Sequence, residues 1–122
     1  APGLFYNYKP ISNERCLSWV NDSLAFFNEK VAGKSYSIFT AGTSAVFLSE
    51  QLSCKPCSFL DEDIQKQGKE INHVPITSPS DIVGCTDIIM PFSIPVNLSI
   101  ISRLTDAYPA LKGSCFIMPL QF

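Results

Sequence analysis

The chain has 122 residues, the usual size of one domain, and 46% of them are hydrophobic while only 16% are charged. Eleven acidic and nine basic side chains leave a formal net charge of −2, so nucleic acid is not expected as a partner. No continuous apolar stretch reaches the roughly 18 residues of a membrane-spanning helix, and so no span is expected. A charged share well below about a quarter predicts a surface that contacts other macromolecules.

The first element is a short edge strand or aromatic arm over residues 4–9, which alternate like a strand before a proline stops them. From Ser12 or Asn13 onward, apolar residues recur at helical spacing, and Gly33 supplies the left-handed residue that commonly ends a helix. The apolar stripe consists of Cys16, Val20, Leu24, Phe27 and Val31. We therefore predict one long N-terminal amphipathic helix.

Two short strands are predicted next, at 35–40 and 44–49, joined by a tight turn. One buried strand with a bulge at Gly42 is the alternative. The segment 58–70 is interpreted as a short surface helix, because its acidic residues precede its lysines in the order that the helix dipole favours. No phosphate-binding loop is predicted, since residues 41–44 lack a lysine and a second glycine.

The rest of the chain is expected to be mainly extended. A strand is predicted over 71–81, and the apolar segment 82–104 suits an edge strand or an arm because its prolines cannot donate to a sheet. A helix over 96–107 is the alternative, and a last strand follows within 112–122. The pattern predicts one α+β domain over 1–122, with the long helix packed on a small mixed or antiparallel sheet.

Five cysteines predict a fold supported by disulfides, with one thiol left unpaired. Four of them lie in loop-like or β contexts, whereas the fifth lies on the helical stripe, where it is either a bridge or a buried thiol. The candidates are Cys54, Cys57, Cys85 and Cys115, with Cys16 as the fifth. Their connectivity stays open.

The segment Cys54-Lys55-Pro56-Cys57 resembles the active-site turn of the thioredoxin family. The resemblance implies a thiol-disulfide oxidoreductase in which Cys54 and Cys57 are the redox pair. That family places a hydrophobic strand directly before the motif, whereas Ser53 stands there in this chain, so this activity is an alternative. The motif could also be half of a zinc site, but no second pair occurs at ligand spacing, and neither a metal nor a cofactor is predicted.

Two N-x-S sequons make Asn21 and Asn97 candidate glycosylation sites. Together with the cysteines and the few charges, they predict a secreted, lumenal or virus-surface protein.

No catalytic constellation stands out, because His73 is the only imidazole and falls in a predicted strand. We therefore predict a domain without enzymatic activity that binds a protein partner or assembles with copies of itself. The excess of apolar residues predicts an exposed interface. The candidate interface residues are Phe5, Tyr6, Tyr8, Met90, Phe92 and Ile94. A carrier of small apolar ligands is a further alternative.

Overall fold

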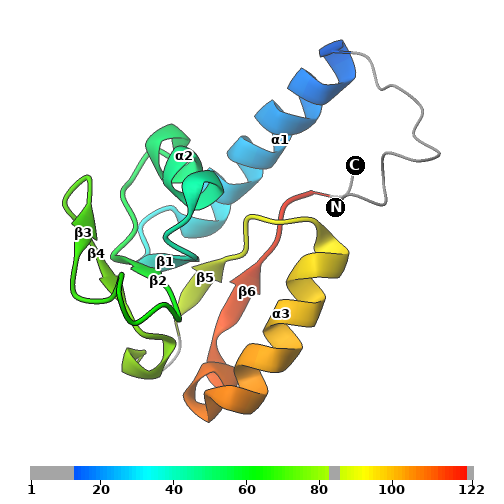
Figure 1. Cartoon of the computed structure of the whole chain (residues 1–122). Helices are drawn as coiled ribbons and strands as arrows, with labels where there is room; N and C mark the ends of the chain where they lie inside the picture. The colour runs from blue at the N-terminus through cyan, green and yellow to red at the C-terminus, as the bar shows by residue number, and fades with distance from the viewer. Residues whose placement is uncertain (1–12, 83–85, 121–122) are drawn as a thin grey trace.

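A computed structural model describes residues 13–82 and 86–120, with the backbone alone for 13–16. It contains three α-helices and a mixed sheet of six strands, which confirms the predicted combination of helices with a mixed sheet (Figure 1). The elements are α1 (Asn13–Val31), β1 (Tyr36–Phe39), α2 (Thr43–Gln51), β2 (Ser58–Leu60), β3 (Glu70–Ile71), β4 (Val74–Thr77), β5 (Asp87–Ile89), α3 (Ile94–Ala107) and β6 (Cys115–Ile117), with short 3₁₀ turns η2 (Pro79–Asp81) and η3 (Pro109–Gly113). The predicted fold with one helix on the sheet is wrong in helix number: α2 was not predicted, and α3 corresponds to the helix over 96–107 that was the alternative.

The sheet is wound outward from its central strand in both directions. Its order is β3-β4-β2-β1-β5-β6, and all pairings are parallel except the antiparallel pair β3 and β4. The chain runs from β1 to β2 and β4 on one side, then returns to the other side of β1 to form β5 and β6. Such a reversal, which here lies between β1 and β5, is the switch point of a doubly wound sheet.

Two hydrophobic cores lie on the two faces of the sheet, because successive strand residues point to opposite sides. Ile38 packs with α1 and α2 through Phe27 and Ala45. Its neighbour Phe39 packs with α3 through Leu104. In Figure 1, α1 and α2 accordingly lie on one side of the sheet and α3 on the other. The central strands β1 and β2 are buried at every residue because both of their faces are covered.

The predicted hairpin over 35–40 and 44–49 is wrong, since β1 is followed by α2 and not by a second strand. Parallel neighbours need a crossover connection, and α2 provides it between β1 and β2. The hairpin in this structure joins β3 to β4 instead, through Asn72 and His73, which have φ angles of 51° and 66°. These angles are those of a tight hairpin turn, so His73 lies in a turn and not in a strand.

The structure also corrects the predictions for segments 58–70 and 82–104. The predicted surface helix at 58–70 is wrong because it begins as strand β2, where Phe59 and Leu60 are fully buried. The segment 82–104 contains β5, an interior strand between β1 and β6, and not an edge strand or arm. Helix α3 then begins at Ile94 with Pro95 in its first turn, where a missing N–H costs nothing.

The predicted disulfide support is not found within the described part of the chain. Cys54, Cys57 and Cys115 are exposed free thiols. Cys57 precedes β2, and Cys115 begins β6, which lies three strands away in the sheet. Three strand spacings amount to about 14 Å. A disulfide needs less than about 7 Å between the two Cα atoms, so these two cysteines cannot be bridged. The Cys16 side chain and Cys85 lie outside the described residues.

The expectation about membranes can be compared with the helices. Within the described residues, no helix has both the length and the apolar character needed to cross a bilayer.

Candidate ligand site at the carboxyl edge of the sheet

The turn between β1 and α2 lies at the carboxyl edge of the sheet, beside the switch point. Gly42 precedes the first residue of α2, and its N–H donates to Oγ1 of Thr40 at 3.1 Å. No side chain among the described residues caps the helix. The backbone amides of Thr43, Ser44 and Ala45 therefore lie in the first turn without intrahelical acceptors, at the positive end of the helix dipole.

Asp61, which directly follows β2, fastens this turn to the neighbouring loop. Its Oδ2 accepts a hydrogen bond from the N–H of Ala41 at 3.0 Å, and its Oδ1 accepts one from the N–H of Asp63 at 2.9 Å. The ammonium group of Lys66 lies 3.8 Å from the same Oδ2. Because Asp61 is buried, its carboxylate acts as an internal tie between the loops after β1 and β2.

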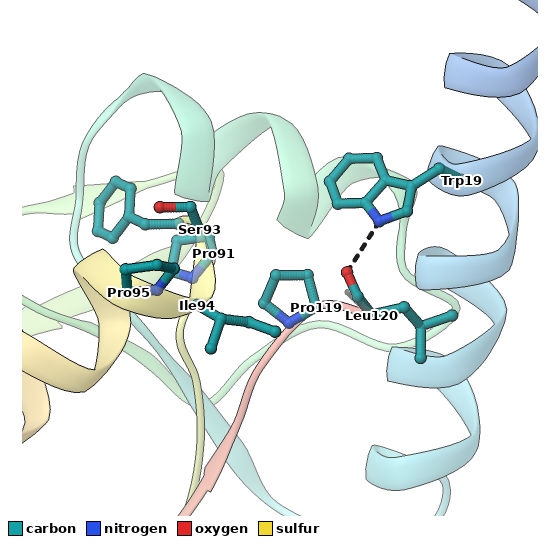
Figure 2. Close-up of a pocket in the computed structure, with 8 residues that line it drawn as sticks. Trp19, Pro91, Ser93, Ile94, Pro95, Pro119 and Leu120 are labelled. Carbon is teal, nitrogen blue, oxygen red and sulfur yellow. Dashed lines mark hydrogen bonds between the residues drawn. The ribbon is translucent and has the colours of Figure 1, made fainter. Parts of the chain in front are cut away.

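Two adjoining cavities open at this edge, and both are lined by Trp19, Pro91 and Pro119. The larger has a volume of about 510 Å³ and lies between α1, the start of α3 and the segment after β6 (Figure 2). The smaller, of about 220 Å³, lies between α1 and α2. Its lining residues are Trp19, Val20, Ser23, Leu24, Phe27, Ser44, Phe47, Leu48, Pro91 and Pro119. None of these described residues has an ionisable side chain.

Ser23 is one of two serines, with Ser44, in the described wall of the smaller cavity. The residue is only 5% exposed, and its hydroxyl has no hydrogen-bond partner among the described residues. A buried polar group without a partner costs about 1–3 kcal/mol, and most such groups in proteins are satisfied. The oxygen itself is fully buried, so a molecule in the cavity does not reach it without a rearrangement of the side chain.

Trp19 joins the first helix to the end of the sheet. Its indole Nε1 donates to the carbonyl oxygen of Leu120 at 2.8 Å, as the dashed line in Figure 2 shows. The ring is half-buried and lies at the wall that the two cavities share.

Asn97 holds the turn between β5 and α3, in which Pro91 and Phe92 line the larger cavity. Its Nδ2 donates to the carbonyls of Met90 at 3.1 Å and Phe92 at 2.8 Å, and its Oδ1 accepts from the N–H of Phe92 at 3.2 Å. Asn97 is fully buried within α3, so its amide is not accessible to a glycan in the folded protein. The sequon at Asn97 is therefore not expected to be occupied, whereas Asn21 is exposed on α1.

No family model, curated protein or solved structure gives a significant match to this chain. The site is therefore interpreted from its own geometry.

The redox candidates Cys54 and Cys57 lie away from this site, before the amino end of β2. The hydroxyl of Tyr36 donates to the carbonyl of Cys54. Burial, with a smaller contribution from the two thiols, raises the pKa of Tyr36 well above its ordinary value, so this donor stays protonated. No cluster of three or more potential metal ligands occurs among the described residues.

The three predicted interface residues that the structure describes are buried or half-buried. Met90 is fully buried, which is a correction, and Phe92 and Ile94 are half-buried in the wall of the larger cavity. Phe5, Tyr6 and Tyr8 lie outside the described residues.

Trp19 and Ser44 were not predicted as site residues. The local signal was the turn at Gly42, which becomes informative once a strand precedes it and a helix follows it.

Proposed function

We propose that the protein binds a phosphate-bearing nucleotide at the carboxyl edge of its sheet, with the phosphate at the start of α2. One observation carries the proposal: the strand order reverses between β1 and β5, and the uncapped start of α2 follows β1 at that point. In open parallel sheets, ligands bind in the crevice at such a reversal. Free amides and the helix dipole favour an anion there.

The residues of the turn support this proposal. The dinucleotide-binding fingerprint is G-x-G-x-x-G/A, placed between a strand and a helix. In Thr40-Ala41-Gly42-Thr43-Ser44-Ala45, Gly42 and Ala45 match its second and third positions. Ala45 is only 1% exposed, in keeping with the close packing that the third position needs. Thr40 replaces the first glycine, and its hydroxyl closes the turn by accepting from Gly42.

Asp61 departs from the usual arrangement. In the fingerprint, an acidic residue about 20 positions further on binds the ribose hydroxyls. Asp61 follows Gly42 by a similar interval, but its oxygens already accept from Ala41 and Asp63. We therefore propose that the protein recognises the phosphate and that Asp61 does not hydrogen-bond the ribose hydroxyls.

The test is calorimetric titration with ADP, GDP and UDP, with adenosine as the control that lacks phosphate. We expect at least one of the diphosphates to bind with a Kd below about 1 mM. If ADP binds, the Kd of adenosine should be at least about tenfold higher than that of ADP. Failure of all three diphosphates to bind in that range would overturn the proposal.

A matched pair of variants locates the anion. Ser44→Asp adds a carboxylate to the first turn of α2, which favours the helix but repels phosphate, so affinity should fall by about tenfold or more without a loss of stability. Ser35→Asp makes the same change at an exposed position before the amino end of β1 and should leave affinity within about twofold. Equal effects of the two variants would contradict the placement of the phosphate.

Protein binding or self-assembly is the second candidate. Two large apolar side chains, Leu17 on α1 and Phe47 on α2, are 62% and 60% exposed, as expected of an interface. Sedimentation at increasing concentration tests self-assembly, and a monomer at all concentrations would count against it. The secreted setting and the redox activity of Cys54 and Cys57 remain predictions, although the setting has lost the support of described disulfides.

A further inference from the structure

Resting on the self-assembly proposed above as the second candidate, and not on nucleotide binding, we infer that two copies of this chain dimerise through the edge strand β6. The two β6 strands pair antiparallel around a twofold axis at Phe116, which joins the two six-stranded sheets into one. The exposed flank of α3 in each copy then packs against α3 of the other copy.

The first support is the free backbone edge of β6. The strand ends the sheet and, among the described strands, pairs with β5 alone (Figure 1). Towards β5, the N–H of Cys115 donates to Thr86 at 3.0 Å, and the carbonyl of Ile117 accepts from Met90 at 2.8 Å. Successive residues of a strand point their backbone groups to opposite sides, so both groups of Phe116 point away from β5, where no described strand lies. An extended backbone is the partner that such an edge fits.

The second support is the difference between the two edges of the sheet. Natural edge strands commonly avoid association by carrying charged side chains. At the opposite edge, β3 contains the exposed Glu70, and the exposed Lys69 directly precedes it. The chain from Ser114 to Leu120, which contains β6, has no acidic or basic side chain. The β6 edge therefore lacks the protection that the β3 edge has.

The third support is the flank of α3 that adjoins β6. Arg103 bonds Glu62, which follows β2, so the flank that carries Arg103 faces the β2 side of the sheet. The buried Leu104 lies about 100° from Arg103 in one direction around the helix and about 120° from Leu98 in the other. Leu98 is therefore on the opposite flank, towards β6, and its side chain is 54% exposed.

This exposed leucine favours a second copy over an isolated peptide strand. A twofold axis normal to the sheet keeps both α3 helices on the same face of the joined sheet, so that each covers Leu98 of the other. A single added strand would satisfy the edge of β6 but would leave Leu98 in water.

Electrostatics also permit two identical surfaces to meet. A twofold axis brings each surface against its own copy, so a cluster of like charge would repel itself. The α3 positions on the flank of Leu98 are all uncharged, and they are Ile94, Leu98, Ile101 and Thr105. Backbone pairing at the edge and apolar contact between the helices are therefore compatible.

The test combines sedimentation equilibrium with a cross-link through a native thiol. We expect a dimer with a Kd below about 100 μM. In the proposed pairing, Cys115 of one copy faces Ile117 of the other, and the two Cys115 residues are diagonal neighbours roughly 7–8 Å apart. A short bismaleimide of similar span should join these two exposed thiols, and peptide mapping identifies the link. A dimer that gives no such link would contradict the pairing.

Two matched pairs of variants locate the interface. Leu98→Lys should raise the Kd at least about tenfold, whereas Val96→Lys, at an exposed position on the β2 side of the same helix, should change it less than about twofold. Cys115→Lys puts a charge on the edge and should also raise the Kd at least about tenfold. Cys54→Lys, at an exposed thiol before β2, is its control. All four positions are exposed, and thermal unfolding checks that each variant folds.

The outcomes separate the inference from the self-assembly on which it rests. If the protein stays monomeric up to about 1 mM, both fail. If it dimerises but Leu98→Lys and Cys115→Lys leave the Kd unchanged, the β6 surface is wrong and self-assembly stands. In that case Phe47→Lys should weaken the dimer, because Phe47 is exposed on the other face of the sheet.

Discussion

The carboxylate of Asp61 accepts a 3.0 Å hydrogen bond from the backbone N–H of Ala41, across the gap between the β2 and β1 loops. The same side chain accepts a second bond from the N–H of Asp63. One buried anion thus fixes the turn that presents the start of α2, and the shape of the proposed phosphate site depends on it.

Replacing Asp61 by alanine should therefore destabilise the protein by about 2–3 kcal/mol, because two charge-assisted bonds to backbone amides are lost. Urea unfolding measures the change. Asp63→Ala is the control, since this exposed carboxylate accepts, among the described residues, from the N–H of Gln65 alone; the change should cost less than about 1 kcal/mol. Equal losses in the two variants would show that the tie is unimportant.

Asn97→Ala should cost about 2–3 kcal/mol, since it leaves the carbonyls of Met90 and Phe92 without their donor in a buried turn. Asn21→Ala, at an exposed position of the other sequon, should change stability by no more than about 0.5 kcal/mol. Intact mass after expression in a glycosylating host checks the same burial. A glycan found on Asn97 of the folded protein would refute it.

The ion pair between Glu62 and Arg103 predicts a pH dependence. Both guanidinium nitrogens bond the carboxylate, at 2.8 and 2.9 Å, and hold the pKa of Glu62 below its ordinary value of 4.5. A lowered pKa in the folded state stabilises the protein above the ordinary value and ceases to do so as the pH falls through the folded value.

Arg103→Ala should therefore raise the pKa of Glu62, as NMR titration can measure. It should lower stability at pH 7 by no more than about 1 kcal/mol, because both side chains of the pair are partly exposed to solvent. The difference from the unmodified protein should shrink towards pH 3. A Glu62 pKa that does not move in the variant would contradict the role of Arg103.

Cys54, Cys57 and Cys115 should all react with a thiol reagent in the native protein without prior reduction, because each is an exposed free thiol. Absorbance on reaction with Ellman's reagent counts them, and peptide mapping assigns the modified positions. Denatured protein gives the total number for comparison. If Cys54 and Cys57 react only after a reductant is added, the pair is a disulfide, as the redox alternative predicts.

The sequence was most informative where periodicity was strong. The stripe over α1 correctly placed Phe27 and Val31 in the core, but Val20 of the same stripe is 38% exposed. Helix α2 has no such stripe, because its apolar residues do not share one buried face: Ala45 is buried while Phe47 is 60% exposed. Its β-branched residues also favour a strand. The acidic run after Leu60 suggested the start of a helix. Its first residue, Asp61, instead accepts a hydrogen bond from Ala41 in the turn after β1.

The candidate site could not be predicted for a different reason. Trp19, Ser44 and Pro91 come from three separate regions, and only the crossovers of a parallel sheet bring them together. Local sequence patterns carry no information about contacts between residues that are far apart in the chain. The turn from Thr40 to Ala45 was the single local signal, and it required a strand and a helix on either side to be informative.

The bond from Trp19 to Leu120 spans 101 positions of the chain. During synthesis on the ribosome, the wall that these residues form is incomplete until β6 has emerged and docked beside β5. A nascent chain lacking that last strand has no full cavity, so a small molecule cannot stabilise it there. Occupation of the cavity would thus report that both ends of the described fold have come together.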